Sequence, residues 1–285
     1  MSDFLRALHS SKVLVMDGAM GTEIMRRLGC QRLECGEAYN LSQPELIRSI
    51  HRAYLDAGAD VLLTNTFQAY SPALWRSDYC DRFDEIWQAG IDLARLQHPR
   101  THFVLADVGP VERLTRKIAV EILRPCAAVD GILLETWSSL EDLRKFRDRP
   151  LDVPLLVSFT FHRTRDYLTF TGATPERCAQ AARQYGAAAL GVNCGKEIGL
   201  EDMLQIVRRY QGVCDLPLFV KPNAGSPGKS GPGYPRTPEA MAVGLLPLMD
   251  AGVRMVGGCC GTTPEHVRAF REVVDEWNSF SARRS

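Results

Sequence analysis

Eight short apolar runs, spaced fairly evenly along the chain, limit the possible folds more than any other feature of the sequence. Most of them lack polar–apolar alternation, which is typical of strands buried on both faces. Stretches with helical periodicity separate them, so the chain is expected to form a (β/α)8 barrel in one domain, residues 1–285. An open doubly wound sheet is the alternative. The runs are residues 13–17, 60–65, 102–107, 131–136, 154–160, 188–194, 217–222 and 254–260.

Four of the helical stretches share a start signal, in which proline and then glutamate follow a threonine or glutamine. The threonine can accept a hydrogen bond from a free helix amide, proline fits the first helical position, and glutamate complements the helix dipole. The first residues of these signals are Gln43, Thr174, Thr237 and Thr263. Three of the helices are expected to end at a glycine, namely Gly58, Gly186 and Gly252. We expect His266, in the first turn of the last helix, to be solvated.

The composition is that of an ordinary globular protein and excludes several classes of function. Hydrophobic residues make up 45% of the 285 residues and charged residues 24%. Lys and Arg balance Asp and Glu at 34 each, so no nucleic acid is expected as a partner. No apolar run reaches the length of a membrane span, and the N-terminus lacks a signal-peptide core, so we expect no membrane partner and a cytoplasmic location. A reducing cytoplasm and an odd number of cysteines, nine, argue against a disulfide scaffold.

The barrel prediction indicates where an active site would lie, because barrel enzymes bind their substrates at the C-terminal ends of the strands. Three of the nine cysteines stand at the predicted ends of the sixth and eighth strands. These two ends are far apart in the sequence, but both face the mouth of a closed barrel. The residues at the predicted strand ends are Asp17, Asn65, Asp107, Glu135, Ser158, Cys194, Asn223, Cys259 and Cys260.

Three thiolates that converge on one point suit zinc, and a catalytic zinc site has three protein ligands and one open position. Cys194, Cys259 and Cys260 would supply the three. The neighbouring glycines let the backbone turn so that adjacent cysteines bind one ion; they are Gly257, Gly258 and Gly261. Simple packing and a vicinal disulfide are the alternatives for the adjacent pair. The other six cysteines lie in predicted loops or helices and are interpreted as structural.

At these residues the chain resembles the homocysteine S-methyltransferase family. The segments "MDGAMGTE", "ADVLLTNTF", "LGVNC" and "GGCCGTTPEH" match its hallmark segments in order. The likeness extends over a core of about residues 12–272. "VKPNAG", a later Tyr-Pro and "GGCCGTTPEHV" are similar to the branch that forms the homocysteine-binding module of cobalamin-dependent methionine synthase. The resemblance implies a zinc-containing (β/α)8 barrel.

The resemblance also implies an activity, the methylation of homocysteine. Cys194, Cys259 and Cys260 would be both the zinc ligands and the catalytic residues. A free thiol has a pKa of about 8.5, and the thiolate is the nucleophile. At the open zinc position the sulfur of homocysteine would lose its proton and attack an activated methyl group to give methionine. Asn223 resembles the family position whose side-chain oxygen can fill the fourth zinc position without substrate.

Other residues at the strand ends are expected to bind the amino acid part of homocysteine. The carboxylates of Asp17 and Glu135 suit its ammonium group, and the family uses the matching positions in this way. Ordinary loop capping is the alternative for both. The backbone amides of Gly18 and Ala19 would receive the substrate carboxylate, and Asn65 is expected to contact the substrate.

The methyl donor is expected to come from outside this sequence, which contains neither a folate-binding barrel nor the Asp-x-His-x-x-Gly motif of a cobalamin domain. The resemblance to the methionine synthase branch favours methylcobalamin on a separate corrinoid protein, and the chain could be a fragment of a larger enzyme. S-methylmethionine and a betaine-type donor are the alternatives. A thiol-binding or zinc-binding subunit without turnover is the competing hypothesis from another class of function.

Overall fold

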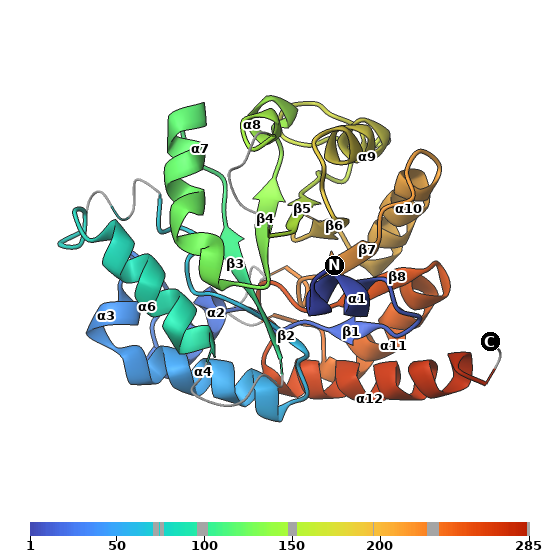
Figure 1. The fold of residues 1–285 in the computed structure, drawn as a ribbon. Coiled ribbons are helices and arrows are strands. Elements are labelled where there is room, and N and C mark those ends of the chain that lie inside the picture. Colours follow the sequence, from blue (N-terminus) through green and yellow to red (C-terminus); the bar gives the residue numbers. More distant parts are fainter. Residues whose placement is uncertain are drawn as a thin grey trace.

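Eight parallel strands form one sheet at the centre of the computed structural model, which describes residues 1–70, 74, 77–95, 102–147, 153–195, 197–226 and 234–283. The strand order is β1-β8-β7-β6-β5-β4-β3-β2. The two edge strands meet through a parallel bridge between Met16 and Val61, and the amide of Asp17 donates to the Val61 carbonyl over 2.9 Å. The sheet therefore closes on itself, and the predicted (β/α)8 barrel is confirmed (Figure 1).

Each of the eight predicted apolar runs overlaps one strand of the barrel. The largest difference lies in the last run, where the strand ends at Val256 and residues 257–260 leave the sheet. The strands are β1 (Leu14–Val15), β2 (Val61–Leu63), β3 (Phe103–Val108), β4 (Gly131–Trp137), β5 (Leu155–Phe159), β6 (Ala189–Asn193), β7 (Leu218–Lys221) and β8 (Val253–Val256).

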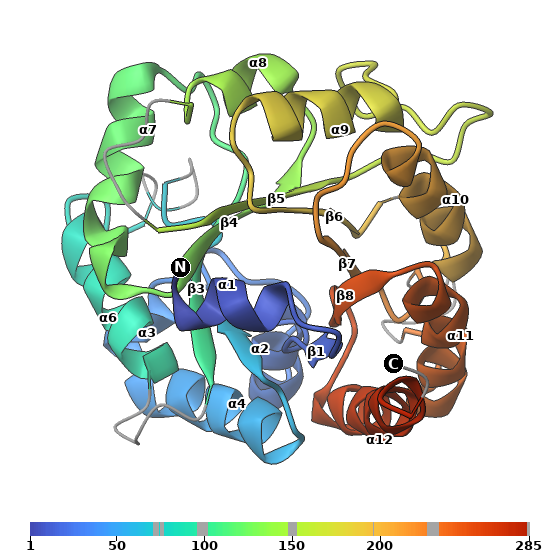
Figure 2. The same cartoon turned by 45° about the vertical axis from the view of Figure 1, so that its right-hand side comes forward.

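The helices surround the strands (Figure 2) and begin where the start signals predicted. Pro44, Pro175, Pro238 and Pro264 are the first residues of the four marked helices. The helices are α1 (Asp3–Leu8), α2 (Gly21–Leu28), α3 (Tyr39–Ser42), α4 (Pro44–Asp56), α6 (Phe83–Arg95), α7 (Arg116–Leu123), α8 (Leu140–Arg144), α9 (Pro175–Gln184), α10 (Leu200–Gln211), α11 (Pro238–Asp250) and α12 (Pro264–Ser281), with the 3-10 helix η1 (Arg124–Ala128) after α7.

Local hydrogen bonds and backbone angles explain these boundaries. The Thr237 side chain accepts from the amide of Ala240 over 3.3 Å at the start of α11. The glycines after α4, α9 and α11 have positive φ values of 99°, 72° and 88°, as predicted for helix ends; they are Gly58, Gly186 and Gly252. The expectation of a solvated His266 is wrong. Its Nδ1 accepts from the Thr263 amide over 3.2 Å, and its Nε2 lies 3.1 Å from the Arg236 carbonyl, so this ring is buried between α12 and the loop before α11.

The interior of the barrel is a packed core of inward-facing side chains. Most strands contribute at least one buried apolar residue to it, and Gly191 on β6 leaves room for the ring of Phe219 on β7. Helix α1 crosses the end of the barrel where the strands begin (Figure 2). Its Phe4 and Leu8 belong to the same interior cluster. Since α1 covers this end, the opposite end is left for a site.

A second, larger core fills the space between the outer faces of the strands and the surrounding helices. Almost every strand position is buried, which agrees with the lack of alternation in the apolar runs. Within the part of the chain that the structure describes, no helix combines the length and apolarity needed to cross a membrane.

Candidate functional site

A cavity of about 430 Å³ opens where the C-terminal ends of the strands meet, the end at which barrel enzymes bind substrates. The turns after β1, β2 and β8, the ends of β3, β4 and β7, the residue after β6 and the start of α2 line it. All but one of the predicted site residues lie in its wall, with Asn223 the exception. They are Asp17, Gly18, Ala19, Asn65, Glu135, Cys194, Cys259 and Cys260.

Three cysteines converge at one side of this cavity. The sulfurs of Cys194, Cys259 and Cys260 lie within 4.8 Å of one another, although the first residue follows β6 and the pair follows β8. Zinc binds sulfur at about 2.3 Å in a tetrahedral shell, so three sulfurs at this spacing fit three corners and leave the fourth open. Among the described residues, no other group of three Cys, His, Asp or Glu side chains is arranged to hold a metal.

The end of β7 holds both cysteine segments in place. The amide of Cys194 donates to the Lys221 carbonyl over 3.2 Å, and the amide of Cys259 donates to the Pro222 carbonyl over 2.9 Å. Cys194 also has a φ of 51°, a left-handed conformation that is uncommon outside glycine. Such a backbone persists only when its surroundings enforce it, and it turns the sulfur of Cys194 toward the pair.

Glycines beside the adjacent cysteines allow the sharp turn that lets both side chains reach one point. A Cβ atom at Gly258 would lie 2.2 Å from the Thr262 side-chain oxygen, so no other residue fits there without movement. Gly261 has a φ of 81°, and its α-carbon packs against the ring of Tyr234. The predicted role of these glycines therefore has a steric basis.

The three thiols share their protons unequally. Hydrogen bonds from Cys259 and Cys260 hold the pKa of Cys194 far below its ordinary value, because they stabilise a negative charge on its sulfur. The same contacts with Cys194 raise the pKa of Cys259 and of Cys260. The cluster therefore retains protons that a metal ion would displace, as expected of thiol ligands.

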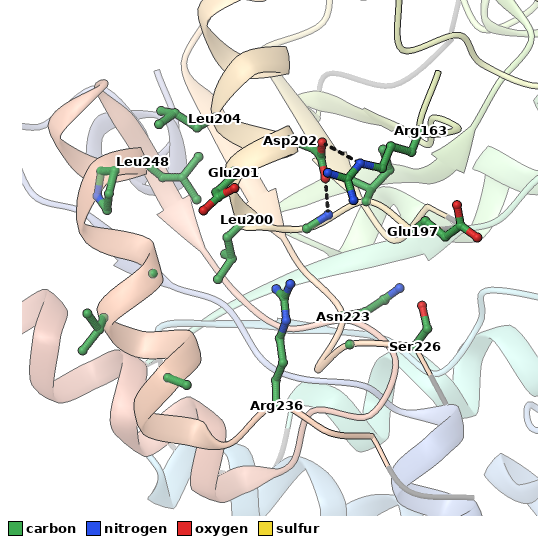
Figure 3. Close-up of a pocket in the computed structure, with 17 residues that line it drawn as sticks. Arg163, Glu197, Leu200, Glu201, Asp202, Leu204, Asn223, Ser226, Arg236 and Leu248 are labelled. Atoms are coloured by element: carbon green, nitrogen blue, oxygen red, sulfur yellow. Dashed lines mark hydrogen bonds and ion pairs between the residues drawn. The ribbon is translucent and has the colours of Figure 1, made fainter. Parts of the chain in front are cut away.

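Asn223 is next to Cys194 but lies in the wall of a second cavity. Its Nδ2 is 3.5 Å from the sulfur of Cys194, and its Oδ1 is buried and accepts no hydrogen bond from the described residues. The second cavity, about 630 Å³, lies between α10, α11 and the turn after β7, and contains Asp202, Arg163 and Arg236 (Figure 3). A buried amide oxygen without a donor, on a side chain whose nitrogen contacts one of the three sulfurs, fits a residue able to complete a metal shell.

Carboxylates and one lysine face each other across the floor of the first cavity. The Nζ atom of Lys221 lies 2.8 Å from Glu135 Oε1 and 3.9 Å from Asp17 Oδ1, and all three side chains are buried. Asp107, at the end of β3, lines the same cavity. One oxygen of each carboxylate is buried without hydrogen-bond geometry to any described donor; these atoms are Asp17 Oδ1, Asp107 Oδ1 and Glu135 Oε1. The cavity therefore offers acceptors to a cation with several donors.

Burial makes two of these carboxylates, Asp17 and Asp107, harder to ionise. It raises the pKa of Asp17 to about 7, although Lys221 acts in the opposite direction. Burial, together with the charge of Glu135, raises the pKa of Asp107 well above its usual range. Burial alone would lower the pKa of Lys221, but the neighbouring carboxylates outweigh it and raise that pKa. Lys221 is therefore held as a cation, while burial makes Asp17 and Asp107 harder to ionise.

Some of the groups predicted to bind the substrate already form hydrogen bonds with other residues of the protein. The amide of Ala19 donates to the Thr262 side chain over 3.1 Å, whereas no described residue accepts a hydrogen bond from the Gly18 amide. Asn65 donates through Nδ2 to the Gly36 carbonyl and to Asn40, so its oxygen is what it can offer a substrate. The role of these residues in substrate binding stays a prediction.

Asn193 is a residue of the site that the sequence analysis missed. It is fully buried at the end of β6, and its Oδ1 accepts from Ser158 Oγ over 2.6 Å and from the Thr136 amide over 3.1 Å. Its Nδ2 donates to Thr136 Oγ1 over 2.7 Å and approaches the sulfur of Cys259 at 3.9 Å. Thr136 has a φ of 64°, which is rare for a β-branched residue. Asn193 therefore holds the strand end that carries Glu135 beside the cysteines.

Lys221 and Asp107 were also not assigned a role from the sequence. Asp107 was noted at a strand end, but only the closed barrel brings it to the same cavity as Glu135. The signal for Lys221 was a charged residue within the apolar run 217–222, where a solvated lysine has no place. The expected end of that strand, Asn223, instead lies in the wall of the other cavity.

Comparison with known proteins relates this geometry to a family. Residues 14–274 match the model of the homocysteine S-methyltransferase family. The chain is 32% identical to methionine synthase of Mycobacterium tuberculosis and 30% identical to that of Mycobacterium leprae, over 96% and 97% of its length. It spans about a quarter of the length of these relatives, since the alignments cover 25% of each.

A solved structure shares the fold over its full length. The metallated form of the homocysteine methyltransferase MmuM from Escherichia coli superposes with a TM-score of 0.75 at 27% identity. The match covers 94% of this chain and 99% of that one. The fold is therefore shared with an enzyme of nearly the same length.

Proposed function

Because the chain belongs to the homocysteine S-methyltransferase family, we propose that it transfers a methyl group to the sulfur of homocysteine with the help of zinc. Cys194, Cys259 and Cys260 would hold the ion. The convergence of their sulfurs within 4.8 Å beside an acidic cavity is the observation that carries the proposal. Zinc, when bound, lowers the pKa of a thiol ligand, so that it is a thiolate at neutral pH.

The cavity supports homocysteine as the thiol. The substrate sulfur would lie at the cysteine cluster. The ammonium group of the substrate would lie toward Asp17 and Glu135, which line the cavity and which Lys221 also approaches. The Gly18 amide would receive the carboxylate. In the reaction the thiol proton is released and a carbon–sulfur bond forms to the methyl group. The bond between the methyl group and its donor breaks, and its electron pair stays with the donor.

The residues of the chain contribute by holding the reacting groups in position. Asn193 holds the end of β4 through Thr136, so that Glu135 stays beside the cysteines. The cavity lies at the C-terminal ends of the strands, and α1 covers the opposite end of a packed barrel. Substrate would therefore enter from the C-terminal end. A fixed position next to the donor turns a collision of two molecules into a step within one complex.

We propose methylcobalamin as the donor, carried by a corrinoid protein or by another part of a longer enzyme. The relation to methionine synthases four times as long supports this choice. S-methylmethionine and a betaine-type compound are the alternatives, and a subunit that binds thiols without turnover is an outcome that the donor assays below would reveal.

The test is the metal content of the purified protein and X-ray absorption at the zinc edge, with and without homocysteine. We expect one zinc per chain, with three sulfur neighbours that become four when homocysteine is added. Cys260→Ala should lose the zinc and the activity but keep the circular dichroism of the barrel. Cys214→Ala, which removes a cysteine outside the cluster, is the matched control and should keep both.

Absence of zinc, or four sulfurs that homocysteine does not change, would contradict the proposal. An unfolded Cys260→Ala would indicate a structural metal instead. Assays of the zinc-loaded protein with methylcobalamin, S-methylmethionine and betaine then identify the donor. Zinc and homocysteine binding without methionine from any of the three would favour the subunit without turnover.

A further inference from the structure

Lys221 places an ammonium group inside the cavity that is proposed to receive the ammonium of homocysteine. It is the last residue of β7 and is only 2% exposed. Its Nζ lies 2.8 Å from Glu135 Oε1 and 3.9 Å from Asp17 Oδ1, the two carboxylates expected to bind the substrate amine. A cation of the chain itself therefore already lies between the two predicted partners of the substrate amine.

The barrel holds this lysine in place from several sides. In the register of the sheet Lys221 pairs with Asn193, and its carbonyl accepts the amide of Cys194. Its stem passes Gly257, where a Cβ atom would lie 3.5 Å from the Cγ atom of Lys221. The proline that follows limits the backbone of residue 221 to extended conformations. The side chain thus reaches the cavity from a rigid strand end.

The charges around Lys221 leave little attraction for a second ammonium group. The carboxyl groups that act on it are Glu135 on β4, Asp17 in the turn after β1, and Asp107 on β3. Burial raises the pKa of Asp17 to about 7 and that of Asp107 well above its usual range, which weakens the attraction of these two groups for a cation at neutral pH. Lys221 balances much of what remains, and a second ammonium beside it would be repelled.

We propose that Lys221 determines substrate specificity, by occupying the ammonium position between Glu135 and Asp17. This inference rests on the proposed function and refines its substrate class. The substrate amine must displace the lysine or share its partners, and therefore adds little to binding. The chain accordingly takes thiols that carry a carboxylate, with or without an amino group.

The experiment compares the affinity of the zinc-loaded full chain for homocysteine and for desamino-homocysteine, the same thiol without its amino group, by calorimetry. For the wild type we expect dissociation constants within about threefold of each other. In Lys221→Met the carboxylates lose their internal cation, and homocysteine should be preferred by about tenfold or more, as for a hydrogen bond to a buried charge. Lys221→Arg keeps the cation and should behave as the wild type does.

Lys145→Met removes a lysine that pairs with Asp142 on α8, outside the cavity, and should leave the ratio unchanged. A wild type that already prefers homocysteine more than about tenfold would overturn the inference without any variant. So would a ratio that Lys221→Met does not change, or a loss of homocysteine affinity that exceeds the loss for the desamino thiol. Binding of neither thiol to the wild type would overturn the proposed function as well.

Discussion

At the scale of single residues, the site depends on side chains whose backbone takes unusual angles at the end of a strand or directly after it. Cys194 and Thr136 both have positive φ, and both lie where a strand ends at the cavity. Asn193 connects them, because it precedes Cys194 and hydrogen bonds Thr136 twice. Strain of this kind is found at functional sites, where precise direction matters more than local stability.

Glu135→Gln tests the role of the carboxylate at the residue scale. We expect it to weaken homocysteine binding by about tenfold or more, because the charge of Lys221 would lose its nearest partner and would then repel the substrate ammonium group. Zinc content should not change, since Glu135 is not part of the cysteine cluster. Calorimetry with homocysteine and metal analysis of the same sample measure the two effects. An equal loss of zinc and homocysteine would argue for a general structural role.

At the scale of elements, local signals explain the helices well, but not what each helix buries. Helix α4 begins at Pro44, as its start signal predicts, and it also carries the buried His51. No described residue hydrogen bonds to either ring nitrogen of His51. Burial, with a smaller contribution from His102, lowers the pKa of His51 from 6.5 to about 3. The helix is therefore packed around a neutral histidine.

Because His51 is buried as a neutral side chain, we predict that acid destabilises the fold. Between pH 6.5 and about 3 the unfolded chain binds a proton at His51 and the native state does not, so stability present above pH 6.5 is lost as the pH falls. Between pH 7 and pH 5 the free energy of unfolding should fall by about 2 kcal/mol through this group. His51→Leu should lack this part of the loss. Urea denaturation of both proteins at the two pH values measures it, and parallel losses would refute the prediction.

At the scale of the whole molecule, one end of the barrel is built for stability and the other for chemistry. Helix α1 crosses the end where the strands begin, and its Phe4 packs edge-on against Phe103 with ring centres 5.3 Å apart. The cysteines, the carboxylates and Lys221 all lie at the other end. Barrel enzymes divide their two ends in this way.

Phe4→Ala tests this division. The side chain is fully buried, so its removal should lower the free energy of unfolding by about 3–5 kcal/mol. Affinity for homocysteine should stay unchanged while the protein is folded, because the site lies at the other end. Urea denaturation and calorimetry check the two parts. Val243→Ala, at a residue that is 62% exposed, is the control and should change stability by less than about 0.5 kcal/mol. A weaker thiol affinity in Phe4→Ala would show that the two ends are coupled.

The sequence by itself determined the order of strands and helices. It also identified the three cysteines whose sulfurs converge at the site. Apolar runs, Thr-Pro-Glu starts and terminal glycines act locally, and the closed order of a parallel barrel converts strand ends into neighbours. Only the tertiary structure decided which polar groups meet at those ends. The position of Lys221 between Glu135 and Asp17, the use of the Asn65 amide within the chain and the burial of His51 and His266 depend on distant side chains. Burial and side-chain direction arise from packing across the barrel, and no local pattern carries that information.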